Sequence, residues 1–382
     1  MVGVWSIVAA LSVSPPDPCF AQPPLSTPPT TATETSPPNA ESAPSNSVAS
    51  IGTLLIVVGP GGTPEYDRQF AEWSREWRAM GERGGLDVIV VEPSPDQRDR
   101  LQQRLDALRD DRSPQAAAAT ESAADSATAA AEVPATEAPM TTSETRGSND
   151  RARWLVLIGH GSYDGRTARF NLQGPDLEPS DLNEALAGVA GPWVIVQGAA
   201  SSGPFLEALS AADRVVITAT RSGDESSAAR WHRHLLDAIA DRRGGGDLDQ
   251  DEQVSVLEAF VSASRGVAAW YAEERRIATE HALLDDDGDG QGATAERLAV
   301  PGATATNEGA SHDGRLAARI VLIPSAWERE RSAEWLARRD RLEQELIEAK
   351  LARTAAPDDP TTFARLREVI DRLADHYRAA ER

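Results

Sequence analysis

Two apolar runs of strand length end in residues that can move a proton or attack a carbonyl group. His160 follows the run at 154–158, and two serines, Ser201 and Ser202, follow the run at 193–196. Buried parallel strands end at one edge of a sheet, and ligands of such sheets bind at that edge. A histidine beside a hydroxyl group is the pair that nucleophilic catalysis requires. The positions of His160, Ser201 and Ser202 after these two runs therefore indicate a candidate site for acid–base or nucleophilic chemistry.

Two acidic loops have the ligand spacing of calcium-binding loops. The first offers Asp247, Asp249, Asp251, Gln253 and Glu258, and the second offers Asp285, Asp287, Asp289 and Glu296. Each loop breaks one rule of the pattern, since Glu252 stands where a sharp turn needs glycine and Gly292 replaces an apolar residue. Calcium takes six to eight hard oxygen ligands, which these side chains largely supply. We expect Ca²⁺ in a structural role; the alternative is a pair of solvated acidic turns.

Short apolar runs alternate with amphipathic segments along most of the chain. We predict strands at 53–58, 86–91, 154–158, 169–172, 193–196 and 214–220, and helices that follow the first strand and at 98–111, 180–186, 204–210, 226–242 and 254–284. Strands that alternate with helices of this length are typical of an α/β fold with a mostly parallel sheet covered on both faces. The sequence therefore predicts that fold class.

Three segments are too poor in apolar residues, or too short, to belong to this core. Residues 1–21 resemble a secretory signal peptide, because the apolar run at 2–13 is too short to span a bilayer and small residues follow it. We predict that residues 22–50, which are rich in Pro, Ser and Thr, form a linker, and that 113–150 is a disordered insertion. We expect an exported protein without a transmembrane segment in its mature chain; the alternative is a cytosolic protein with a disordered N-terminus.

A helical hairpin is predicted in the C-terminal region, 311–382. Charged amphipathic helices at 327–353 and 361–380 flank a proline-containing turn. The apolar seam is predicted to consist of Leu342, Leu346, Leu351, Phe363, Leu366, Ile370, Leu373 and Tyr377. The hairpin either docks on the preceding domain or binds a partner, which includes self-association through 327–382.

Charge and composition exclude several classes of function. The 38 basic and 60 acidic residues give a net charge of −22, which repels nucleic acid. Lys350 is the only lysine, so phosphate loops and Schiff-base sites lack their essential residue. Cys19 is the only cysteine, which excludes an intramolecular disulfide and a cysteine-rich zinc site. The glycines at 59–62 lack the spacing of a dinucleotide-binding loop.

The two strand ends together resemble those of the caspase-like cysteine peptidases, and specifically the legumain-type family. In that family His-Gly ends one strand and Glu-Ala-Cys-Glu-Ser-Gly ends the next; here the corresponding segments are His160-Gly161 and Gly198-Ala199-Ala200-Ser201-Ser202-Gly203. The resemblance covers 51–110 and 151–284. It implies a caspase-like, three-layer α/β/α domain at 51–310, and a cleft that binds peptides.

The resemblance also places Ala200 where the family has its catalytic cysteine. Alanine has no proton to lose and no lone pair to attack with, and loss of a nucleophile costs on the order of 10⁶ in turnover. Gly198 likewise replaces an acidic pocket residue. The leading hypothesis is an inactive homologue that binds a peptide or protein. The alternatives are a hydrolase that uses Ser201 or Ser202 with His160, and a calcium-responsive interaction module.

Overall fold

The computed structural model describes residues 52–110, 152–189, 191–227, 229–242, 244–298 and 313–380. The predicted signal peptide, the linker and the insertion at 113–150 lie outside these described residues. The predicted boundary between the α/β domain and the hairpin, at 310–311, lies outside them too.

A six-stranded sheet forms the centre of the fold, in the order β2-β1-β3-β6-β7-β8. Its strands are β1 (Thr53–Val58), β2 (Asp87–Val91), β3 (Arg153–Ile158), β6 (Trp193–Gln197), β7 (Arg214–Thr218) and β8 (Leu283–Asp285). The first five are parallel, and β8 pairs antiparallel with β7. Strands β1, β3 and β6 are buried along almost their whole length, which explains why they are continuous apolar runs.

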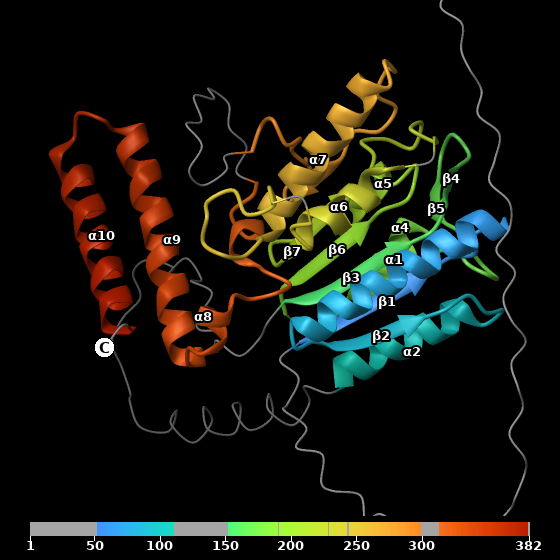
Figure 1. Ribbon diagram of the computed structural model, residues 1–382, viewed down its shortest axis with the longest axis horizontal. Coiled ribbons are helices and arrows are strands. Elements are labelled where there is room, and N and C mark those ends of the chain that lie inside the picture. The colour runs from blue at the N-terminus through green and yellow to red at the C-terminus, as the bar shows by residue number, and fades with distance from the viewer. Residues whose placement is uncertain are drawn as a thin grey trace, which may run out of the picture. The chain divides into compact units, whose positions relative to one another are not determined.

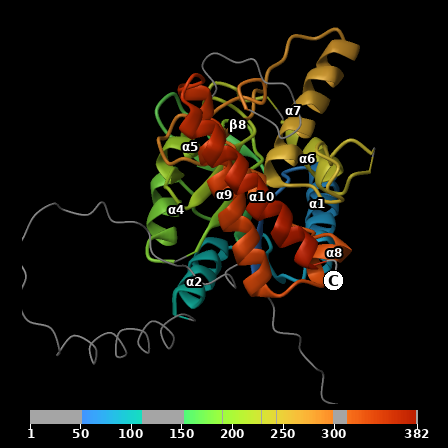
Figure 2. The ribbon, with the colours of Figure 1, turned by 90° about the vertical axis from the view of Figure 1, so that its left-hand side faces the viewer.

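Helices cover both faces of this sheet (Figures 1 and 2). One face carries α1 (Pro64–Arg83), α6 (Trp231–Ile239) and α7 (Val256–Glu273), and the other carries α2 (Gln97–Asp110), α4 (Pro179–Leu186) and α5 (Gly203–Leu209). Successive strand residues serve opposite cores: Leu54 and Ile56 pack on the first face, and Leu55 and Val57 on the second. The predicted three-layer α/β class with a mostly parallel sheet is confirmed.

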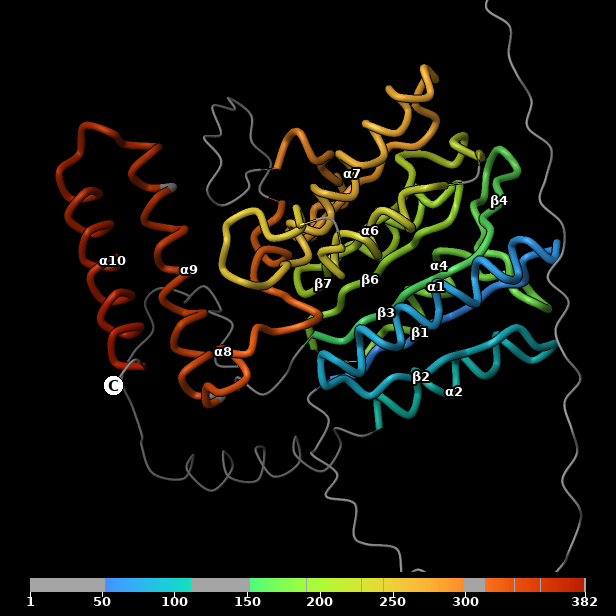
Figure 3. Tube along the Cα trace, in the orientation of Figure 1, coloured from blue at the N-terminus to red at the C-terminus, as the bar shows by residue number. Residues whose placement is uncertain are grey.

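Two smaller features complete the described chain. A two-stranded antiparallel sheet, β4 (Gly161–Tyr163) with β5 (Ala168–Phe170), begins directly after His160. The C-terminal region contains η1 (Ala317–Arg319), α8 (Ala326–Arg329), α9 (Ala333–Ala355) and α10 (Pro360–Ala380). Helices α9 and α10 form the predicted antiparallel hairpin (Figure 3). Among the described residues, no helix combines the length and the apolarity that crossing a bilayer requires.

Three of the predicted helices are shorter than expected. Helix α6 covers only Trp231–Ile239 of the predicted 226–242. Helix α7 ends at Glu273, and Arg275 then takes a left-handed conformation with φ of 53°. The helix predicted at 254–284 is therefore wrong beyond α7, since Ile277 is 89% exposed in the segment that follows and Leu284 belongs to β8. The helix predicted at 327–353 is divided into α8 and α9, because the side chain of Ser332 accepts a hydrogen bond from Trp335 N and caps a new helix.

The seam of the hairpin differs from the predicted one. On α10 the buried residues are Val369 and His376, whereas Phe363 and Ile370 are 55% and 46% exposed. The His376 ring stacks on Trp335 at 4.3 Å between centroids. The predicted residues Leu366, Leu373 and Tyr377 are partly buried.

A buried histidine on α6 joins this helix to α1 on the same face of the sheet. Trp77 Nε1 donates a hydrogen bond of 2.9 Å to His232 Nε2, and the imidazole stacks on Trp73 at 4.9 Å. His232 has no exposed surface. Burial, assisted by the charge of Arg233, lowers the pKa of His232 to about 3, so the ring is neutral in the native state.

Acid is expected to destabilise the fold through this side chain. An unfolded chain binds a proton on His232 below about pH 6.5, whereas the folded chain resists protonation down to about pH 3. Stability contributed by the neutral ring is thus complete above pH 6.5 and is lost as pH falls, by on the order of 4 kcal/mol. Urea unfolding of the His232→Gln variant should show a flatter pH dependence between 3 and 6.5. His234→Gln, on the same helix, should keep the wild-type slope; equal slopes for H232Q and wild type would contradict this account.

Candidate functional site

The sheet brings the two predicted motifs to one edge. Strands β3 and β6 are parallel neighbours, with Leu157 in register with Gln197, so both run toward the same side. Beyond the strand ends the two segments touch: a Cβ atom placed on Gly161 would lie 2.0 Å from the carbonyl oxygen of Ala200. Glycine at 161 is therefore a steric requirement of this close approach.

His160 is held by the loop after β1 and by helix α1. Its Nε2 lies 3.0 Å from the carbonyl oxygen of Gly61. Because a carbonyl group only accepts, we assign the proton to Nε2, which leaves Nδ1 as the basic nitrogen of the neutral ring. The ring meets Tyr66 and Phe70 edge-on, with centroid distances of 4.6 and 5.1 Å. The histidine of the motif is thus positioned by contacts with other side chains and backbone.

The segment after β6 contains Ala200 and the two serines of the strand-end motif. Ala200 is buried. Ser201 has a left-handed backbone with φ of 55°, and its Oγ atom is buried without a hydrogen-bond partner among the described residues. Ser202 Oγ lies 3.0 Å from Thr220 Oγ1 and accepts a hydrogen bond of 3.1 Å from Thr220 N.

In the described chain, neither serine hydroxyl forms a hydrogen bond with a histidine side chain. A general base must reach the hydroxyl proton within about 3 Å. Ser201 Oγ has no partner of any kind in the described chain, and Ser202 Oγ is committed to Thr220. The same Thr220 hydroxyl accepts from Ser202 N at 2.7 Å and so completes the start of α5. Ser202 therefore has a structural role, and Ser201 lies shielded from solvent.

A contact that sequence reasoning missed explains Gly198. A Cβ atom on Gly198 would lie 2.0 Å from Nδ1 of the buried His232. The His232 side chain, from α6, thus occupies the space that a larger residue at position 198 would need. The sequence gives only a weak indication of this contact, because His232 lies on a predicted amphipathic helix and nothing in its spacing relates it to Gly198.

The loop after β7 closes over the same edge. The carbonyl oxygen of Glu225 accepts a hydrogen bond of 2.9 Å from Ser201 N. The Glu225 carboxylate in turn contacts His281 Nδ1 at 2.6 Å and Arg221 Nε at 3.1 Å. These contacts hold the loop across the strand ends, so that Ser201 is covered.

The first acidic loop gathers part of its predicted ligand set. Oxygens of Asp247, Asp249 and Glu258 lie within 4.8 Å of one another. Glu252 takes the left-handed conformation, with φ of 70°, at the position where glycine is usual. Burial and the neighbouring charge of Glu258 raise the pKa of Asp249 to about 6. Asp251 instead pairs with Gln253, whose amide donates to it at 3.2 Å, and neither belongs to the close cluster.

The second acidic loop gathers a different set from the predicted one. Asp285 and Asp287 lie close to Asp313, which the loop pattern does not contain. Asp289 accepts a hydrogen bond from Gln291 N, and Glu296 lines a separate hollow beside Trp231. Of the four predicted ligands, only the first two are therefore brought together with a third carboxylate.

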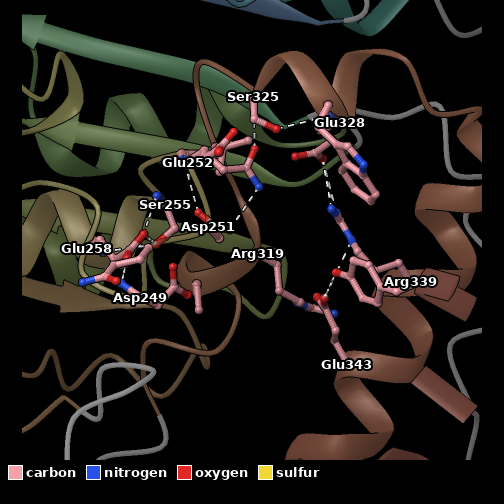
Figure 4. Close-up of a pocket in the computed structure, with 16 residues that line it drawn as sticks. Asp249, Asp251, Glu252, Ser255, Glu258, Arg319, Ser325, Glu328, Arg339 and Glu343 are labelled. Atoms are coloured by element: carbon pink, nitrogen blue, oxygen red, sulfur yellow. Dashed lines mark hydrogen bonds and ion pairs between the residues drawn. The ribbon is translucent and has the colours of Figure 1, made fainter. Parts of the chain in front are cut away.

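An acidic pocket of about 430 Å³ lies between the first acidic loop, the η1 segment and the hairpin (Figure 4). Its charged lining consists of six carboxylates and two guanidinium groups, from Asp249, Asp251, Glu252, Glu258, Glu328, Glu343, Arg319 and Arg339. Figure 4 shows the loop carboxylates on one side and the Glu328–Arg339–Glu343 group on the other. We call this hollow the acidic pocket.

Both arginines of the acidic pocket already have partners. Arg339 lies 3.3 Å from Glu328 and 2.7 Å from Asp340, and Arg319 donates to the Gln344 side chain at 3.1 Å. Trp327 and Tyr377, whose rings stack at 5.8 Å, supply aromatic surface. Negative charge beside aromatic rings is a favourable environment for a cationic ligand.

The two serines are expected to respond differently to alanine substitution. Ser202→Ala removes a buried hydroxyl that bonds to Thr220 and should lower the free energy of unfolding by about 1–3 kcal/mol. Ser201→Ala removes an unpartnered buried hydroxyl and should leave stability unchanged or raise it slightly. Chemical denaturation of both variants tests this difference, and a larger loss for S201A than for S202A would show that Ser201 Oγ has a partner.

No protein-family model and no curated protein sequence matches this chain. Three solved structures that align with it are caspases. Caspase-1 from Spodoptera frugiperda aligns with a TM-score of 0.35 and 11% identity, over 62% of this chain and 86% of that chain. The Drosophila initiator caspase Dronc aligns with a TM-score of 0.34 and 13% identity, over 64% and 82%. The structure of pro-sf-caspase-1 aligns with a TM-score of 0.34 and 9% identity, over 58% and 82%.

Proposed function

We propose that this protein is a non-catalytic homologue of caspase-like peptidases that binds a basic segment of a peptide or protein in the acidic pocket. The observation that carries the proposal is the charge of that pocket: six carboxylates and two arginines line it, which leaves an excess of four negative charges. We infer the relation to peptidases from the two strand-end motifs. We expect no turnover because the residue at position 200 is an alanine, which has no nucleophilic side chain.

The geometry of the strand ends supports a binding role over a catalytic one. Position 200 holds an alanine in a buried segment beside Gly161. Ser201 is enclosed by the loop that carries Glu225, and Ser202 bonds to Thr220. A substrate carbonyl therefore meets no activated nucleophile at this edge.

Electrostatics in the acidic pocket support a cationic ligand. Burial raises the pKa of Glu343, and burial together with nearby carboxylates raises the pKa of Asp249 to about 6. The Asp249 shift records a cost of placing negative charge among other carboxylates, whereas Arg339, 3.9 Å from Glu343, offsets part of that cost at Glu343. An arginine or lysine side chain of a partner offsets that cost, as the guanidinium of Arg331 does over the Trp327 ring at 4.3 Å from its centroid.

Neutralising the exposed acids of the pocket should weaken binding of a basic peptide. Asp251 and Glu252 are exposed and line the pocket, so the double variant D251N/E252Q should fold normally. We expect its Kd for a fluorescein-labelled Arg/Lys/Gly/Ser peptide to rise at least about ten-fold, which is about 1.4 kcal/mol. Fluorescence anisotropy in EDTA, with an acidic peptide as the negative probe, measures this.

A matched variant separates pocket binding from general attraction to an acidic surface. D96N/E184Q removes the same charge from exposed positions outside the pocket lining. It should bind the basic peptide as the wild type does. An equal loss of affinity in the two double variants would contradict the proposal, and so would the absence of measurable binding by the wild type.

Binding should also strengthen with pH. Asp249 gains its negative charge as pH rises through about 6, so affinity for the basic peptide is expected to increase between pH 5 and 7. Asp249→Asn should remove most of that increase while leaving the part due to Glu343, whose pKa burial also raises. Anisotropy titrations at pH 5, 6 and 7 check this, and an unchanged pH dependence in D249N would exclude Asp249 as the titrating group.

A further inference from the structure

A buried carboxylate oxygen without a partner lies at the end of β8. Asp285 has no exposed surface. Its Oδ1 accepts a hydrogen bond of 3.1 Å from Gly288 N, but its Oδ2 is buried and has no hydrogen-bond partner in the described chain. A buried charged oxygen that lacks a partner is costly, and native proteins rarely retain one without a role.

Two further carboxylates face the same point. One oxygen each from Asp285, Asp287 and Asp313 lies within 4.8 Å of the others. Neither Asp285 nor Asp287 forms an ion pair with a basic side chain of the described residues. Three like charges at this separation repel one another, and a cation between them would reverse that repulsion.

The backbone around the three carboxylates is fixed by other bonds. Asp286 points away from the cluster and accepts hydrogen bonds of 2.8 Å from Gly314 N and Ala317 N. Asp313 Oδ1 accepts one of 3.0 Å from Asp286 N. Gly288, with φ of 81°, packs so closely that a Cβ atom would lie 2.7 Å from Ala212 N. The backbone around the cluster is therefore fixed by Asp286 and by the packing of Gly288, together with bonds that the carboxylates of the cluster accept from it.

Ligand chemistry selects the kind of cation. The cluster offers carboxylate oxygens and contains no histidine or cysteine, which disfavours zinc and other soft metals. Calcium accepts irregular arrangements of oxygen ligands and completes its shell with backbone carbonyls and water. Magnesium needs a stricter octahedral geometry.

We propose that Asp285, Asp287 and Asp313 bind one calcium ion, which links the end of β8 to the segment that begins at Asp313 and leads into the C-terminal helices. The ligand set differs from the predicted loop, since Asp313 replaces Asp289 and Glu296. The ion is structural: it ties a strand of the sheet to η1.

Thermal unfolding of the full chain tests the site. In EDTA, Asp285→Asn should match or exceed the melting temperature of the wild type, because it removes a buried charge without a partner. Millimolar CaCl₂ should raise the melting temperature of the wild type and should raise that of D285N by much less. Asp289→Asn, in the same loop but outside the cluster, should keep the full response to calcium. A D285N response equal to that of the wild type overturns the proposal, and so does a wild type that does not respond.

Calorimetric titration with CaCl₂ separates this site from the first acidic loop. Asp287→Asn changes an exposed ligand and should lower the calcium affinity at least about ten-fold, whereas Asp249→Asn should leave this site unchanged. If D249N abolishes the calcium response and D287N preserves it, the ion binds in the first loop and the proposal is wrong.

Discussion

The parallel pairing of strands that are buried on both faces is the constraint on which the other features depend. Strands β1, β3 and β6 present apolar side chains to two separate cores, so helices must cover both sides of the sheet. Polar residues are then confined to the strand ends. Because β3 and β6 are parallel neighbours, His160 and Ala200 reach the same edge, and the small side chains there allow the two segments to touch. The strand-end site follows from this topology.

Much of the fold could be predicted from sequence because its signals are local. Strand β1 has the predicted bounds, and β2, β3, β6 and β7 end within about two residues of theirs, since each is an apolar run bounded by turn residues. Strand β8 was missed because Leu283 and Leu284 continue the helical pattern of α7, and only pairing with β7 shows that they are extended. The C-terminal hairpin was predicted, but its seam depends on the stacking of His376 on Trp335, which apolar periodicity does not encode.

The candidate sites were less predictable because they join residues that lie far apart in the chain. The motif residues His160 and Gly161 could be found from strand ends, but the contact of His232 with Gly198 depends on how α6 packs. The burial of Ser201 and the bonding of Ser202 to Thr220 depend on the loop after β7. Asp313 carries no spacing relation to Asp285, so only the fold reveals it as a neighbour. The spacing of acidic residues thus identified the two acidic segments, whereas only the structure shows which carboxylates lie close together.

The central proposal is that the strand-end site holds no working nucleophile. Its most direct test is to treat the full chain with fluorophosphonate and peptide chloromethylketone probes, with and without millimolar calcium, and to map any adduct by peptide mass spectrometry. The account predicts no covalent label on Ser201 or Ser202 under either condition, because one hydroxyl is enclosed and the other is bonded to Thr220. A label on either serine that disappears in His160→Ala would contradict it and would make the protein a serine hydrolase.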